Sequence, residues 1–248
     1  MGAMEGHMMV SSLNTPIAAT PRVSRRTVDA PTRMFHWLLA GCFAGAYASA
    51  ESDHWRWLHV TLGYTMAGLL TWRVVWGLVG PRHVRWSALL SKLRALPGWL
   101  QQVGQAQVPP ARQTQNLGMA LAVLAILVLV ALTTASGYVL YQEWWGDALE
   151  DVHETLGNGL LLVVLGHIGL VLALSAWRRQ NHAWPMLTGR TAGPGPDLVK
   201  RNHGWLAALM LVAVMGFWGW QWTQAPVGEG PAATSHVHDH DHHDDDDD

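Results

Sequence analysis

Apolar residues collect along the chain in long stretches that are separated by polar and charged segments. A helix needs roughly 20 mostly apolar residues to cross a lipid bilayer. Five stretches have about that length. They are residues 34–50, 57–79, 117–141, 152–177 and 205–222. This pattern predicts an all-α transmembrane helical bundle with a four-helix core and a fifth, C-terminal transmembrane helix.

The basic residues lie on one side of these five crossings. Fourteen of the sixteen Lys and Arg residues fall before the first stretch, between the second and third, or between the fourth and fifth. They are Arg22, Arg25, Arg26, Arg33, Arg82, Arg85, Lys92, Arg94, Arg112, Arg178, Arg179, Arg190, Lys200 and Arg201. Cytoplasmic loops carry an excess of basic residues, so the N-terminus is predicted to be cytoplasmic and the C-terminus to lie outside.

Composition supports a membrane protein and excludes several kinds of site. Half of the residues are hydrophobic and only 14% are charged, whereas soluble domains carry about 25% charged residues. A single cysteine, Cys42, excludes a disulfide framework and a Cys-rich metal cluster. The sequence has no C-x-x-C-H motif for covalent haem attachment, no phosphate-binding loop and no nucleic-acid-binding surface.

The pattern divides the chain into four parts. Residues 1–33 form a cytoplasmic N-terminal segment, and residues 34–190 form the four-helix bundle. Residues 191–222 contain a linker and the fifth helix, and residues 223–248 form a disordered tail rich in His and Asp. Within the long connection after the second stretch, residues 86–103 are expected to form an amphipathic helix on the inner membrane surface.

Four histidines fall within or at the ends of these stretches, where ionisable side chains are costly and usually functional. They are His36, His59, His153 and His167. His167 follows His153 by 14 residues, which is roughly 21 Å along a helix and within roughly 40° of the same direction. The topology predicts that His59 meets His153 at the outer level and that His36 meets His167 at the inner level.

Two facing imidazole pairs at two depths suit two haem b groups with bis-histidine ligation. Protein ligands at both axial positions leave electron transfer as the natural task. Small residues beside the histidines would leave clearance for a porphyrin, although close helix packing uses the same residues. They are Gly41, Ala44, Gly45, Gly63, Ala67, Gly68, Gly157, Gly166 and Gly169. His54 is an alternative outer ligand. Arg33, Arg56 and Arg73 could pair with haem propionates, but interfacial snorkelling explains each of them as well.

Several motifs resemble one family. The stretches at residues 29–37 (DAPTRMFHW), 59–64 (HVTLGY) and 73–83 (RVVWGLVGPRH), with His153-Glu154 and His167, occur in order. They are similar to bacterial cytochrome b561-type membrane proteins, including nickel–iron hydrogenase b-type cytochrome subunits. The resemblance covers about residues 27–190. It implies a four-helix bundle in the bacterial inner membrane that binds two haem b groups and exchanges electrons with quinones and a partner redox protein. By position it implies that His36, His59, His153 and His167 are axial ligands.

The C-terminal tail allows a different function. His236, His238, His240, His242 and His243 stand among seven aspartates, a mixture that binds divalent metals weakly or simply remains solvated. The tail would also attract a basic partner such as a periplasmic c-type cytochrome. The main alternative is therefore a transition-metal transporter or sensor that uses the span histidines and this tail. A haem-free anchor for a dehydrogenase, an oxidoreductase for a small reductant such as superoxide, and a homodimer also remain open.

Overall fold

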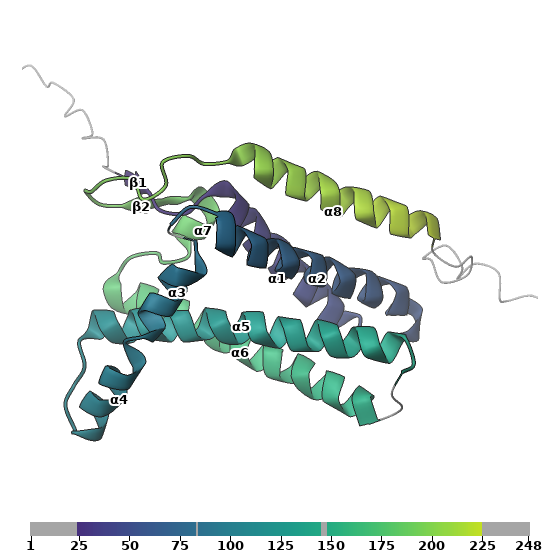
Figure 1. Ribbon diagram of the computed structural model, residues 1–248, viewed down its shortest axis with the longest axis horizontal. Coiled ribbons are helices and arrows are strands. Elements are labelled where there is room, and N and C mark those ends of the chain that lie inside the picture. The colour runs from purple at the N-terminus through teal and green to yellow at the C-terminus, as the bar shows by residue number, and fades with distance from the viewer. Residues whose placement is uncertain (1–23, 83, 145–147, 225–248) are drawn as a thin grey trace, which may run out of the picture.

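The computed structural model describes residues 24–82, 84–144 and 148–224, and most of these are helical (Figure 1). The long helices are α1 (Ala30–Ala48), α2 (Arg56–Val79), α5 (Ala111–Tyr141), α6 (Ala148–Arg178) and α8 (Gly204–Gln224). The short elements are β1 (Ser24–Arg26), η1 (Asp53–Trp55), α3 (Trp86–Leu93), α4 (Leu96–Gly104), α7 (Trp184–Thr188) and β2 (Arg190–Ala192). The strand β1 lies at one end of the bundle and α8 finishes at the other (Figure 1). We call these the β1–β2 end and the opposite end.

The predicted helical bundle is confirmed, but its count of five spans is not. In the described part of the chain, α5, α6 and α8 are long and apolar enough to cross a membrane. The helices α1 and α2 have 19 and 24 residues. Both carry polar side chains within that length, including Arg33 and His36 in α1 and Arg73 in α2, which lowers their apolar character. Their crossing of the membrane therefore stays a prediction.

One apolar core joins the long helices. Cys42 in α1, Met66 in α2, Val130 in α5 and Leu160 in α6 are all buried within it. The last helix, α8, contributes Met210 and Val214 to the same core. The indole Nε1–H of Trp218 in α8 also donates to the Thr65 hydroxyl in α2 at 2.9 Å. The fifth helix thus extends the bundle, and Cys42 is one of the packed residues of the core.

The β1–β2 end is closed by segments that are far apart in the sequence. β1 pairs antiparallel with β2, and Arg26 lies opposite Arg190. The next amide, that of Thr27, donates to the Gly189 carbonyl at 2.9 Å. Gly189 has φ +76°, and a Cβ there would lie 2.8 Å from the Val28 carbonyl oxygen, so the position requires glycine. Asp29 then starts α1 by accepting the Thr32 amide at 3.0 Å.

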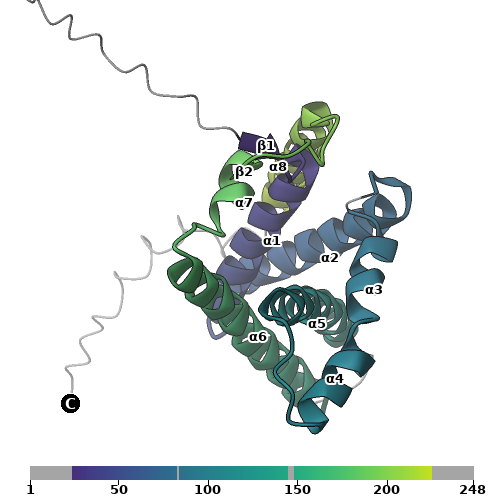
Figure 2. The same ribbon diagram turned by 90° about the vertical axis from the view of Figure 1, so that its left-hand side faces the viewer.

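The connection between α2 and α5 contains two helices where one was predicted. Helix α3 ends at Leu93 and α4 begins at Leu96. Pro97 occupies the first turn of α4, where its missing amide hydrogen is harmless, whereas inside a continuous helix it would remove a hydrogen bond. Both helices run across the β1–β2 end of the bundle, as the view along the bundle shows (Figure 2).

Candidate functional site

His59 and His153 lie together near the opposite end of the bundle. His59 lies in the first turn of α2 and His153 lies early in α6. Their ring centroids are 6.0 Å apart and the ring planes cross at 78°. Two imidazoles that share one metal ion, each bonded at about 2 Å, have a similar separation. An ordinary ring contact has it too, so the hydrogen bonds of the two rings carry more information than the distance.

The hydrogen bond of His59 defines which ring nitrogen is available. Its Nδ1 lies 2.8 Å from the carbonyl oxygen of Ala46 in α1. A carbonyl can only accept, so Nδ1 carries the hydrogen and donates. In the neutral ring, Nε2 then keeps its lone pair. A donated Nδ1–H bond to a carbonyl is the usual way in which a protein orients a histidine that ligates a metal.

His153 is held in a similar way by α5. Its Nδ1 lies 3.0 Å from the Ser136 hydroxyl oxygen, and that hydroxyl donates to the Thr133 carbonyl at 3.0 Å. With its single hydrogen committed to Thr133, Ser136 accepts from His153 Nδ1–H, and Nε2 is again left with a lone pair. Gly137 makes room for the ring, because a Cβ there would lie 2.8 Å from His153 Cε1.

Ser136 and Gly137 were missed at the level of sequence. The small residues predicted to lie beside the haems are in the first, second and fourth apolar stretches, where the histidines are, whereas these two are in the third. The run Thr133-Thr134-Ala135-Ser136-Gly137 was the available signal, because it places several small and polar residues inside an otherwise aliphatic stretch.

His36 in α1 and His167 in α6 form the second group, nearer the β1–β2 end. Both side chains are half-buried, and the two rings are close enough to interact electrostatically. The Nδ1 atoms of both rings are buried and have no hydrogen-bond partner among the described residues. A buried polar atom without a partner is costly and calls for an explanation, which a bound ligand would supply.

The small residues beside the histidines separate into two groups. A Cβ at Gly45 would lie 2.8 Å from Leu62 Cδ1, so this glycine serves the close approach of α1 and α2. At the remaining glycines named from the sequence, a Cβ would meet no atom of another described helix within 4 Å. They are Gly41, Gly63, Gly68, Gly157, Gly166 and Gly169. Direct helix packing therefore does not explain them.

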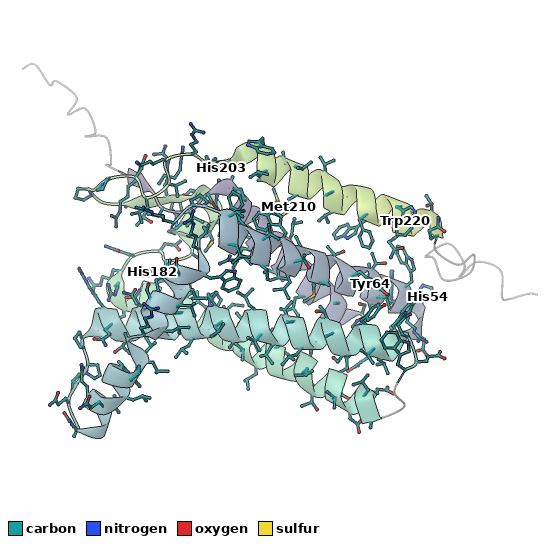
Figure 3. All side chains as sticks on the ribbon, viewed as in Figure 1. His54, Tyr64, His182, His203, Met210 and Trp220 are labelled. Carbon is teal, nitrogen blue, oxygen red and sulfur yellow. The ribbon has the colours of Figure 1, made fainter. Side chains whose placement is uncertain are left out.

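The other candidates from the sequence take different places. His54, in η1, packs edge-on against Trp55, and Figure 3 places it at the opposite end of the bundle from His182 and His203. The Arg33 guanidinium donates to the Leu187 carbonyl at 2.7 Å. The Arg73 guanidinium lies over the Trp86 ring, 4.9 Å from its centroid. The five tail histidines at positions 236–243 lie outside the described residues.

The two histidine groups suit a metal ion that receives most of its ligands from a cofactor. Among residues 24–82, 84–144 and 148–224, no group of three or more His, Cys, Asp or Glu side chains could hold a metal ion. A zinc site usually takes at least three protein ligands, whereas a haem iron takes only one or two because the porphyrin supplies the rest. The two histidine groups fit haem on these grounds, because the Nδ1 atoms of one pair are hydrogen-bonded and those of the other are buried without a partner among the described residues.

Comparison with known proteins identifies the family. The family model described as prokaryotic cytochrome b561 matches residues 27–189. No curated protein and no solved structure matches the chain. The two ends of the matched region meet in the fold, where Thr27 donates to Gly189, and α8 lies beyond it. The match includes all four histidines and covers more than half of the chain. The chain therefore belongs to the prokaryotic cytochrome b561 family, and is an integral membrane b-type cytochrome of electron transfer.

Proposed function

We propose that the chain is a dihaem cytochrome b that carries single electrons between the quinone pool and a periplasmic redox partner, such as a c-type cytochrome or a dehydrogenase or hydrogenase. The observation that carries this proposal is the placement of two histidine groups along α6. His153 and His167 are 14 residues apart on this helix, or roughly 21 Å at 1.5 Å per residue. His153 has His59 of α2 beside it, and His167 lies within electrostatic range of His36 of α1.

In this proposal His59 and His153 hold one haem, and His36 and His167 hold the other. When bound, each haem supplies a reversible one-electron change of its iron between the ferrous and ferric states. The protein orients the first pair through the Ala46 carbonyl and the Ser136 hydroxyl. If both imidazoles of a pair ligate one haem iron, they would leave no position on it open to oxygen or water.

The charge distribution supports an orientation in the membrane. Arg178, Arg190 and the basic residues of β1 lie at the β1–β2 end, which we assign to the cytoplasm under the positive-inside rule. Exposed Glu150 and Asp151 begin α6 at the opposite end, which would then face the periplasm. An acidic surface there suits a basic redox partner. The His59–His153 pair would be the one nearer to that partner.

The lengths of α1 and α2 support two further crossings. At 1.5 Å per residue, their 19 and 24 residues reach about 28 Å and 36 Å. The hydrocarbon core of a bilayer is about 30 Å thick. With α5, α6 and α8, they would give five crossings, and the described chain does begin and end at opposite ends of the bundle (Figure 1).

A reduced-minus-oxidised visible spectrum, with pyridine-haemochrome quantitation of the purified protein, tests the proposal. We expect about two haem b per chain. Replacing His59 or His153 by Ala should remove one of them, and replacing His36 or His167 should remove the other. Retention of the second haem in each variant shows that the protein still folds. Absence of haem in protein made with adequate haem supply would refute the proposal and favour the metal transporter or sensor.

A further inference from the structure

The helices α3 and α4 form an element that the electron-transfer function does not use. They cross the β1–β2 end of the bundle instead of running along it (Figure 2). If α5 and α6 cross the membrane, this direction places α3 and α4 roughly parallel to the membrane surface. A helix in that position contacts acyl chains with one face and headgroups or water with the other.

The element is held in place by polar contacts at both ends. The Trp86 indole Nε1–H, at the start of α3, donates to the Val74 carbonyl at 3.2 Å, and its ring also lies under the Arg73 guanidinium. The Trp99 indole, in α4, donates to the Thr114 hydroxyl in α5 at 3.0 Å. The surface that α3 and α4 present is therefore preformed.

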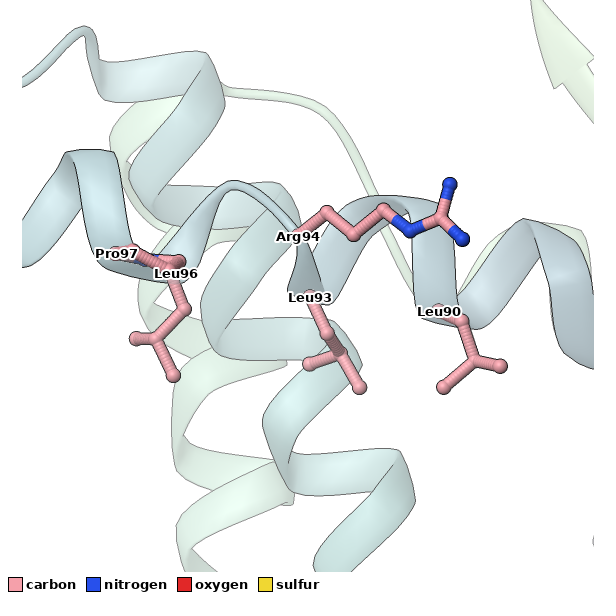
Figure 4. A pocket seen from close by; sticks show the side chains of 5 residues that line it. All are labelled: Leu90, Leu93, Arg94, Leu96 and Pro97. Atoms are coloured by element: carbon pink, nitrogen blue, oxygen red, sulfur yellow. The ribbon is translucent and has the colours of Figure 1, made fainter.

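The leucine side chains and the Arg94 guanidinium point in different directions on this element. Leu90, Leu93 and Leu96 point to one side, and the Arg94 guanidinium points to the other (Figure 4). These residues and Pro97 line an open groove of about 440 Å³. Leu90 and Leu100 are about half exposed, at 51% and 54%. Apolar side chains so exposed in a surface element indicate contact with something apolar.

The charge of the segment identifies the polar part of that contact. Residues 81–116 carry five basic side chains and no Asp or Glu. The five are Arg82, Arg85, Lys92, Arg94 and Arg112, and all five are exposed. A basic cluster on an amphipathic element next to membrane-spanning helices is typical of a site for anionic lipid headgroups.

From these observations we infer that α3 and α4 form a binding site for an anionic phospholipid of the leaflet at the β1–β2 end. An acyl chain lies along Leu90, Leu93 and Leu96, and the phosphate group binds Arg94, with the positive charge of Lys92 adding to the attraction. The site depends on the membrane placement of α5 and α6 and not on the number of haems or the redox partner. Failure of the dihaem proposal would therefore leave it standing.

Lipid binding to the full-length haem protein tests the inference. The protein is delipidated in detergent and titrated with phosphatidylglycerol or phosphatidylcholine, and bound lipid is counted by native mass spectrometry. The variant Lys92→Gln/Arg94→Gln should raise the dissociation constant for phosphatidylglycerol by roughly tenfold and leave that for phosphatidylcholine unchanged. Leu90→Ser should weaken the binding of both lipids.

The matched control is Arg178→Gln/Arg179→Gln, which removes the same charge at the same end of the bundle. We expect it to keep phosphatidylglycerol binding within about twofold of the parent protein. An equal loss in the control would show general electrostatic attraction and overturn the site. Equal affinity of the parent protein for the two lipids would overturn it as well. Loss of a dimer with unchanged lipid binding would instead assign the surface to a second copy of the chain.

Discussion

Replacing Gly137 by Ala should weaken one haem site and spare the other. A Cβ at Gly137 would lie 2.8 Å from His153 Cε1 and 3.3 Å from Nδ1. Ordinary contact begins at 3.4 Å, so the imidazole must move by about 0.6 Å or more. The same ring is held by Ser136 at 3.0 Å, so this movement strains or breaks that bond.

The size of the effect follows from the cost of overpacking. An added methyl group in a well-packed site costs about 1–3 kcal/mol, which corresponds to roughly a 5-fold to 150-fold loss of affinity. If His153 is an axial ligand, this loss falls on the haem held by His59 and His153. His36 and His167 are elsewhere on α1 and α6, so their haem should be retained.

Transfer of haem to excess apomyoglobin measures this difference directly. We expect the Gly137→Ala protein to lose one haem per chain faster than the parent protein and to keep the second at the parent rate. Gly118→Ala is the matched control, because it is the same change on the same helix and its Cβ meets only Leu170 Cδ2 at 3.6 Å. Equal retention of both haems in the two variants would refute the assignment of His153.

Three further predictions concern the contacts around the bundle. Ser136→Ala removes the acceptor of His153 Nδ1–H, and the loss of this bond favours the ferrous over the ferric iron. One midpoint potential should therefore rise by about 20–65 mV, the equivalent of one hydrogen bond. Unchanged potentials in a redox titration would contradict this. Thr65→Val removes the acceptor of Trp218 Nε1–H and should lower the midpoint of thermal unfolding by about 2–4 °C with both haems retained. The control is Thr71→Val, whose hydroxyl bonds only within α2. A fall of the same size in the control would show that the contact with α8 is not the cause. Deletion of residues 225–248 should abolish weak Ni²⁺ binding, measured by calorimetry, and leave the haem spectrum unchanged; undiminished Ni²⁺ binding would place the metal site elsewhere.

Prediction from the sequence was most successful where the signal lies within one helix. The apolar stretches located the five long helices because an apolar run reports the environment of its own residues. The helices α1, α5 and α6 begin several residues earlier than predicted, because a first turn such as Ala111-Arg112-Gln113-Thr114 in α5 is helical without being apolar. The spacing of His153 and His167 on α6 likewise needs only the pitch of one helix.

Contacts between separate segments were harder to predict from the sequence. The break between α3 and α4 follows from Pro97, a local signal that the amphipathic pattern obscured. The pairing of β1 with β2 joins residues about 165 positions apart through three-residue strands, which are too short to show a period. In the same way, no periodicity in α5 relates Gly137 to His153, which lies on the next long helix, 16 residues further along the chain.

The sequence by itself determined the membrane character of the chain, its helices and the four histidines that are candidates for haem ligation. These follow from apolar length, charge distribution and helical pitch, which are properties of single segments. Only the tertiary structure decided which atoms orient the histidine rings, namely the Ala46 carbonyl and the Ser136 hydroxyl. It also decided which glycines lie in close contact with another helix. Those features depend on how one helix is rotated and shifted against another. That arrangement is set by the packing of all the helices together, so no single segment encodes it.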